Sequence, residues 1–210
     1  MNLAWLQDQC REYLSDIVPE DAAHDINHIK RVVKNVIYLT DIEDANSLIT
    51  LPSAWLHDCV AVAKDSPLRA QGSRLAAEAA TQFLVKISYP DELIPDVFHA
   101  IEAHSFSAGI PTRSLEAAVV QDADRLDSLG AIGIARCLLV GGKLNTPLFN
   151  PEDPFCEQRE PDDSQFTIDH FYAKLFKLSE TMKTEAGRVE SQRRADLMRR
   201  YLDDLREELG

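Results

Sequence analysis

The sequence has few glycines and few cysteines, and each shortage excludes a class of protein. Eight glycines in 210 residues, with no recurring turn–strand–turn rhythm, argue against an all-β fold. The four cysteines lie far apart and form no CxxC pair, which argues against a disulfide scaffold and a thiolate zinc site and indicates a reducing compartment. They are Cys10, Cys59, Cys137 and Cys156.

Long apolar runs and an excess of basic charge are also missing. No stretch reaches the roughly 18 apolar residues of a membrane span, and the N-terminal MNLAWLQDQCREYL lacks the pattern of a signal peptide. The formal net charge is −13, so neither a nucleic-acid polymer nor a membrane is an expected partner. We expect a cytoplasmic protein whose substrate can still be a small anion, because a metal ion reverses the sign of the charge locally.

Apolar residues at helical spacing fill most of the chain. They predict helices over 2–17, 25–40, 46–63, 73–86, 91–104, 114–140, about 167–184 and 186–208. We expect the long run over 114–140 to bend near Gly130 or Gly133, and the proline-rich stretch 141–165 to form a long irregular loop. With no internal repeat and a length suited to one core, we predict a single all-α domain over residues 1–210.

The dipeptide His57–Asp58 directly follows the apolar run Ala54–Trp55–Leu56. A buried carboxylate is costly unless it is hydrogen-bonded, ion-paired or bound to a cation. Neighbouring side chains on a helix point about 100° apart, yet both can reach one ion that lies between them. The alternative is a core histidine beside a capping or ion-paired aspartate.

Two further segments carry side chains that bind metals. His28 lies at the edge of the apolar stripe of residues 25–40, where it is either a ligand or a core histidine. In VVQDADRLDSLG, three carboxylates within six residues interrupt an apolar helix, which is unfavourable without a nearby cation. They belong to Asp122, Asp124 and Asp127, and Arg125 is the alternative partner for one of them.

Together these segments form the ordered pattern H…HD…D, which resembles the HD-domain superfamily of metal-dependent phosphohydrolases. Four stretches across nearly the whole chain resemble the YedJ/YpgQ-like branch of bacterial HD hydrolases: HDINHIKRV, IEAHSF, VVQDADRLDSLGAIGIAR and TIDHFYAKLFKLSETMKTEAGR. The resemblance implies a single HD-type helical bundle. It also implies the metal ligands His28, His57, Asp58 and Asp124, with Asp122 as the alternative to Asp124.

The resemblance also implies a chemistry. Two imidazoles and two carboxylates suit Mn²⁺, with Fe²⁺, Co²⁺, Ni²⁺ or Zn²⁺ as alternatives, better than Ca²⁺ or Mg²⁺. We expect a nucleoside triphosphate to be hydrolysed to the monophosphate and pyrophosphate. The alternatives are a phosphomonoesterase or phosphodiesterase for another small phosphate, and a non-catalytic metal-bound sensor or binding module. The last stays open because Ala61 stands where some HD phosphohydrolases carry lysine or glutamate.

Further candidates complete the predicted site. Asp58 and His104 are the candidate catalytic residues; His104 could donate a proton to the leaving group, support a ligand, bind a second ion, or serve structure alone. Lys64 and Arg125 are candidate phosphate contacts, and Glu78 is a candidate for binding substrate or for hydrogen bonding to a ligand histidine. Each of these three could equally be an ordinary surface or ion-paired residue. A homodimer is a further expectation that the sequence leaves open.

Overall fold

The structure, a computed structural model, describes residues 1–15, 26–60, 62, 71–105 and 108–210. Every regular element among them is helical and none is a strand, which confirms the predicted all-α fold. The chain divides into two compact units, residues 1–124 and 125–210. The prediction of one domain over the whole chain stays a prediction, because a compact unit need not fold alone.

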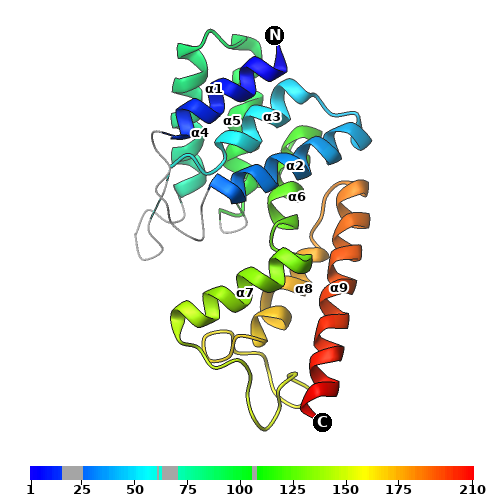
Figure 1. Cartoon of the computed structure of the whole chain (residues 1–210). Helices are drawn as coiled ribbons and strands as arrows, with labels where there is room; N and C mark the ends of the chain where they lie inside the picture. Colours follow the sequence, from blue (N-terminus) through cyan, green and yellow to red (C-terminus); the bar gives the residue numbers. More distant parts are fainter. Residues whose placement is uncertain (16–25, 61, 63–70, 106–107) are drawn as a thin grey trace. The chain divides into compact units, whose positions relative to one another are not determined.

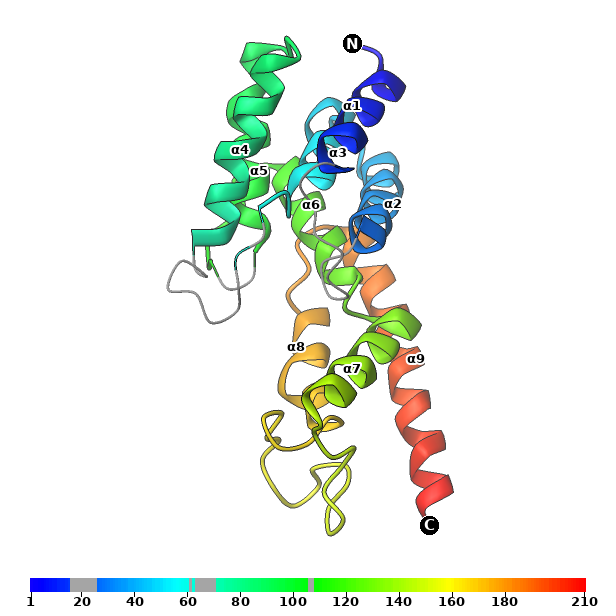
Figure 2. The same ribbon diagram turned by 60° about the vertical axis from the view of Figure 1, so that its left-hand side comes forward.

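The first unit contains α1 (Leu3–Ser15), α2 (Ile26–Glu43), α3 (Ser47–Leu56), α4 (Gly72–Lys86), the 3₁₀ turn η2 (Asp91–Leu93), α5 (Ile94–His104) and most of α6 (Leu115–Leu126). Every residue of α3 from Ile49 to Leu56 is buried, as expected for a helix that is apolar on all sides. It packs against α1, α2 and α5, and α4 runs beside α5 (Figures 1 and 2). The core of this unit is therefore built around α3.

Pro52 lies inside α3 and removes one hydrogen bond from the helix. A proline has no N–H, so the carbonyl of Leu48, four residues earlier, has no partner within the helix. The hydroxyl of Tyr89, a buried residue that follows α4, donates to that carbonyl instead. Burial raises the pKa of Tyr89, which keeps the hydroxyl protonated and able to donate.

Several predicted helix boundaries were wrong, although the chain does break near Gly130, where a bend was expected. The helix predicted over 46–63 ends at Leu56, and the N–H of Cys59 closes a turn onto the Leu56 carbonyl. The run predicted over 114–140 is two helices, because α6 ends at Leu126 and α7 (Gly130–Leu144) begins at a glycine with φ of 72°. A positive φ is readily adopted by glycine and cannot continue a right-handed helix.

The second unit contains α7, the π-helical turn η3 (Phe171–Leu175), α8 (Phe176–Ser179) and α9 (Glu185–Leu209). Both α7 and α8 pack against α9. The helix predicted over 167–184 is thus shorter, covering Phe171–Ser179. The irregular loop begins at 145 rather than 141, because α7 continues to Leu144 and ends at Asn145 in the left-handed conformation.

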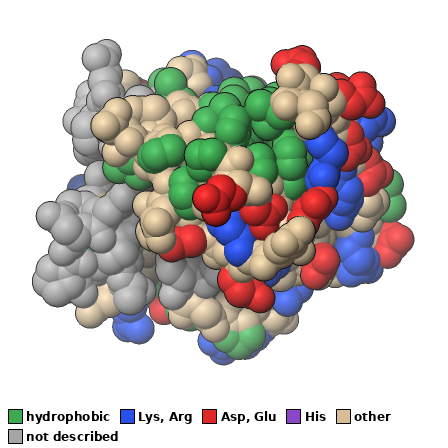
Figure 3. Space-filling view, turned by 90° about the horizontal axis from the view of Figure 1, so that it is seen from below, with side chains coloured by type: hydrophobic (Ala, Val, Ile, Leu, Met, Phe, Trp, Pro, Cys, Tyr) green, Lys and Arg blue, Asp and Glu red, His purple; other side chains and the backbone are tan. Residues whose placement is uncertain are grey.

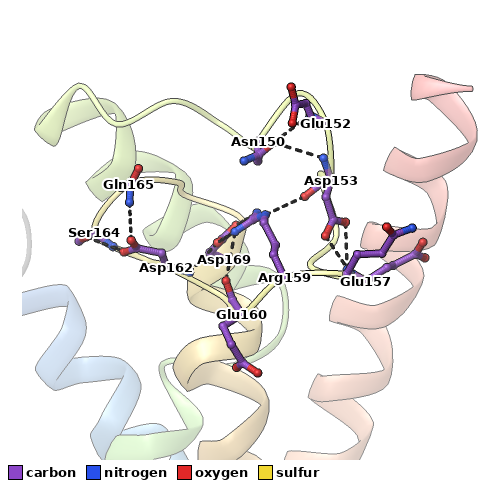
Figure 4. A network of polar contacts seen from close by, with 11 residues as sticks. Asn150, Glu152, Asp153, Glu157, Arg159, Glu160, Asp162, Ser164, Gln165 and Asp169 are labelled. Carbon is purple, nitrogen blue, oxygen red and sulfur yellow. Dashed lines mark hydrogen bonds and ion pairs between the residues drawn. The ribbon is translucent and has the colours of Figure 1, made fainter.

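The loop between α7 and η3 is irregular but extensively hydrogen-bonded (Figure 4). The carboxylate of Asp169, which is fully buried, accepts hydrogen bonds from the Arg159 guanidinium and from the Asp162 backbone N–H, the latter at 2.7 Å. Burial by itself would raise the pKa of Asp169, but these donors outweigh it and hold the pKa below its usual value. A single carboxylate at the end of the loop thus holds the segment 159–162.

The surface of the described residues carries both charged and apolar side chains. On the face drawn in Figure 3, hydrophobic side chains gather in one patch, and acidic and basic side chains are interspersed beside it. No helix in the described part of the chain is both long enough and apolar enough to cross a membrane.

Candidate metal centre

Three histidines and two aspartates from four segments of the first unit form one cluster, in which every side chain lies close to at least one other member. The Nε2 atoms of His28 and His57 are 3.3 Å apart. The Oδ2 atom of Asp58 lies 3.8 Å from the first nitrogen and 3.7 Å from the second. The Oδ1 atom of Asp124 lies 3.5 Å and 3.9 Å from the same two nitrogens. The Nε2 atom of His104 completes the cluster, 3.7 Å from the Oδ1 atom of Asp58.

The end of α3 brings His57 and Asp58 to the same point. His57 is the residue that caps the helix, and Asp58 lies in the turn after it. On a continuing helix their side chains would diverge by about 100°, whereas the turn lets both face His28. The sequence correctly paired these two residues, but it placed them within a helix that the structure ends before them.

Asp124 rather than Asp122 contributes its carboxylate to the cluster. The two residues are two positions apart on α6, so their side chains point about 160° apart around the helix axis. Asp122 is fully buried, while the Asp124 side chain is 27% exposed. This placement favours Asp124 as the fourth metal ligand.

The hydrogen bonds of two histidines fix their tautomers. The Nδ1 atom of His57 lies 2.8 Å from the Ala54 carbonyl, and that of His104 lies 2.6 Å from the Ile101 carbonyl. A carbonyl only accepts, so each Nδ1 carries a proton, and the Nε2 of each ring faces the cluster. Burial lowers the pKa of His57 and favours the neutral ring.

The spacing of these atoms suits one divalent transition-metal ion. Bonds of about 2.1 Å place two ligand atoms about 3.0 Å apart when they are adjacent on an octahedral ion, and about 4.2 Å apart when they are opposite. The two histidine nitrogens lie 3.3 Å from each other, and each lies 3.5 to 3.9 Å from the carboxylates of Asp58 and Asp124, between those limits. His28, His57 and Asp58 offer ligand atoms that all lie within 4.8 Å of one another. The two carboxylates also offset the charge of the ion, so the residues present fit such a group.

The other predicted site residues lie elsewhere or outside the described part of the chain. Glu78 is exposed on α4, and its carboxylate pairs with Arg74 at 3.2 Å rather than with a ligand histidine. Arg125 is buried, and its guanidinium donates to the backbone carbonyl and the hydroxyl of Thr181, both at 2.9 Å. That contact indicates a structural role for Arg125. Lys64 is not among the described residues.

Two buried amides near the cluster were not predicted. Asn35 lies in the apolar stripe of α2, and Gln121 lies on α6 just before the aspartates. Each is a polar residue at a buried position of its helix, and a polar residue at the spacing of the apolar stripe was the available signal. A sequence does not show which backbone carbonyl such an amide will reach.

Comparison with known proteins identifies a family with these features. HD domains are all-helical and bind divalent metals through a His/Asp cluster. The HD domain family matches residues 25–129, half of the chain. The chain belongs to this family, which confirms the resemblance predicted from its motifs.

The relatives also place the chain within the family. It is 28% identical to the protein YpgQ of Bacillus subtilis over 207 residues, 96% of this chain and 93% of that one. A crystal structure of YpgQ in complex with ADP matches with a TM-score of 0.78 and 29% identity, covering 99% of this chain and 97% of that one. An HD-superfamily hydrolase from Bacillus thuringiensis matches with a TM-score of 0.73 and 31% identity, covering 97% of each chain. These matches support assignment of the chain to the YpgQ-like branch of the family.

Proposed function

We propose that the protein is a metal-dependent phosphohydrolase that cleaves a nucleoside triphosphate into the monophosphate and pyrophosphate. The observation that carries the proposal is the convergence of the Asp58 and Asp124 carboxylates on the neighbouring Nε2 atoms of His28 and His57, at distances that suit one divalent ion. Membership in the HD-domain family supports hydrolysis of a phosphate compound. The ADP complex of YpgQ supports a nucleotide as the substrate.

The four ligands would hold Mn²⁺, or alternatively Fe²⁺, Co²⁺, Ni²⁺ or Zn²⁺, because a mixed imidazole and carboxylate set suits these ions. Such an ion lowers the pKa of a bound water and neutralises negative charge on a phosphoryl group. The Nδ1–H of His57, held by the Ala54 carbonyl, keeps the Nε2 lone pair directed at the ion. Asp58 is both a ligand and a candidate catalytic residue, because it faces the two ligand histidines and His104.

His104 is the residue we propose to move a proton. Its Nδ1 proton is held by the Ile101 carbonyl, so only Nε2, which faces Asp58, can exchange a proton with the reacting groups. In this role Nε2 would take the proton that the attacking water loses and pass it to the leaving phosphate oxygen as its bond to phosphorus breaks. Phosphate contacts from Lys64 and Arg125, substrate binding by Glu78 and assembly as a homodimer stay predictions; for Arg125, the bond to Thr181 favours structure.

The experiment is release of pyrophosphate and phosphate from a panel of nucleoside triphosphates with Mn²⁺, comparing the wild type with Asp58→Asn. Asp41→Asn is the matched control, because Asp41 is an exposed aspartate on α2, the helix that carries His28. We expect pyrophosphate release that persists in Asp41→Asn and falls by at least about 100-fold in Asp58→Asn.

Other results would redirect or overturn the proposal. Release of inorganic phosphate alone would replace it with hydrolysis of the terminal phosphoanhydride bond. Activity that survives Asp58→Asn would place the reaction at another site. Tight Mn²⁺ binding without turnover of any nucleotide would instead favour a different phosphate substrate or the metal-bound binding module that Ala61 leaves open.

A further inference from the structure

A buried amide on α2 holds the segment that carries Asp124. Asn35 lies seven residues after His28, two helical turns further along, so both side chains share one face of α2. Its side chain is buried, and its Nδ2 donates to the backbone carbonyl of Ala123 at 3.0 Å. Ala123 directly precedes Asp124. One hydrogen bond thus connects the helix of the first histidine to the backbone beside the last aspartate.

A second buried amide repeats this arrangement between α6 and α5. Gln121 of α6 is 3% exposed, and its Nε2 donates to the backbone carbonyl of Ala103 at 2.7 Å. Ala103 directly precedes His104. Because a carbonyl only accepts, the nitrogen of each amide must face it, which fixes the orientation of both groups. Within the described part of the chain, the Oε1 atom of Gln121 is buried and has no hydrogen-bond partner.

We propose that Asn35 and Gln121 are positioning residues of the cation centre. Asn35 sets Asp124 on α6 against His28 on α2, and Gln121 sets His104 on α5 against α6. The inference rests on the proposed function, since it assigns these amides to that same centre. Neither side chain is among the metal ligands, so both act through the backbone of a neighbouring helix.

Apolar packing alone would not hold the helices in register. The faces beside these amides carry Ile29, Val32 and Val36 on α2 and Ala100 and Ile101 on α5, all fully buried. Apolar burial is not directional, so a small slide of one helix costs little packing but changes every ligand-to-ligand distance. A hydrogen bond to one particular carbonyl is directional and opposes that slide.

The test replaces each amide by an apolar side chain of similar shape, Asn35→Leu and Gln121→Met. Thr40→Val is the matched control, because it breaks another buried hydrogen bond between helices, from Thr40 on α2 to Thr50 on α3 at 2.9 Å. Thr40 lies twelve residues from His28, about 18 Å along the helix. Each variant removes one buried hydrogen bond between helices, so we expect comparable losses of stability, and a difference at the centre then reports positioning.

The two amides have separate readouts. Asn35→Leu is expected to raise the Mn²⁺ dissociation constant, measured by electron paramagnetic resonance without substrate, about tenfold, and Thr40→Val to change it less than about twofold. Gln121→Met is expected to lower kcat about tenfold at saturating Mn²⁺ with little change in KM, since His104 is not one of the four ligands.

A wild-type dissociation constant in Asn35→Leu, or a kcat in Gln121→Met equal to that of Thr40→Val, would overturn the corresponding assignment. The metal-free protein separates this failure from failure of the proposed function. There, the imidazole resonances of His28 should move in Asn35→Leu and those of His104 in Gln121→Met, while both stay in place in Thr40→Val. Unmoved resonances would overturn the proposal even in a protein that binds no Mn²⁺. If Asn35→Leu does not fold, Asn35→Ser removes the same amide.

Discussion

The Nε2 atoms of His28 and His57 lie 3.3 Å apart although 29 positions separate the two residues. The His57 nitrogen carries a lone pair, because its other ring nitrogen is protonated towards the Ala54 carbonyl. A second lone pair on the His28 nitrogen would repel it at this distance, so either a proton on His28 or a cation must lie between the two atoms. The carboxylates of Asp58 and Asp124 beside both nitrogens favour the cation.

Loss of His28 should therefore remove the stabilisation that a metal provides. We expect Mn²⁺ at a hundred times its dissociation constant to stabilise the wild type by about 2.7 kcal/mol, seen as a rise in Tm that chelation reverses. His28→Gln should abolish this rise. His99→Gln is the control, because His99 lies on α5 and its Nε2 accepts from the Arg113 N–H outside the cluster. Equal rises in both variants would contradict the assigned site.

Asp169→Asn should loosen the loop between α7 and η3. The change removes the charge that accepts from Arg159 and Asp162, and we expect a loss of about 2 kcal/mol in the free energy of unfolding, with faster proteolysis within residues 145–168. Asp163→Asn, in the same loop but with a 43% exposed side chain paired to His170, should change little.

The effect of Asp169 should also depend on pH. The pKa of this carboxyl is lowered in the folded protein. The carboxylate therefore makes its full contribution to the free energy of unfolding above the ordinary pKa of 3.8, and that contribution is lost as the pH falls below this value. Urea unfolding of both proteins should be measured at a series of pH values. The difference in the free energy of unfolding between the wild type and Asp169→Asn should become smaller below pH 3.8. A constant difference would show that charge is not the cause.

The adjacent glycines of α7 should respond in opposite directions to alanine. A Cβ at Gly141 would lie 2.3 Å from the Thr167 hydroxyl oxygen, whereas one at Gly142 would meet nothing within 4 Å. We expect Gly141→Ala to lower the free energy of unfolding by about 2 kcal/mol, and Gly142→Ala to raise it by up to about 0.5 kcal/mol through helix propensity. Thermal or urea unfolding of the pair measures both. Similar changes in both variants would refute the close contact at Gly141. Thr167→Ala should restore part of the stability that Gly141→Ala loses.

The helical spacing of apolar residues was sufficient to predict the fold class and most helices, because such periodicity is a local property of the sequence. It could not predict where a helix stops when apolar residues continue beyond the stop. The end of α3 at Leu56 occurs inside such a run, where a turn closed by the Cys59 N–H stops the helix. The break before Gly130, in contrast, falls where a glycine had indicated a bend.

The sequence by itself determined the kinds of side chain that meet at the candidate centre, since polar residues within apolar runs require a partner. Only the tertiary structure decided that Asp124 rather than Asp122 faces His28, and that Arg125 reaches Thr181. It alone showed that Asn35 and Gln121 bind the carbonyls beside Asp124 and His104. The reason is physical: a side chain's chemistry belongs to its residue, but its partner is set by the rotation and register of helices that are distant in the chain.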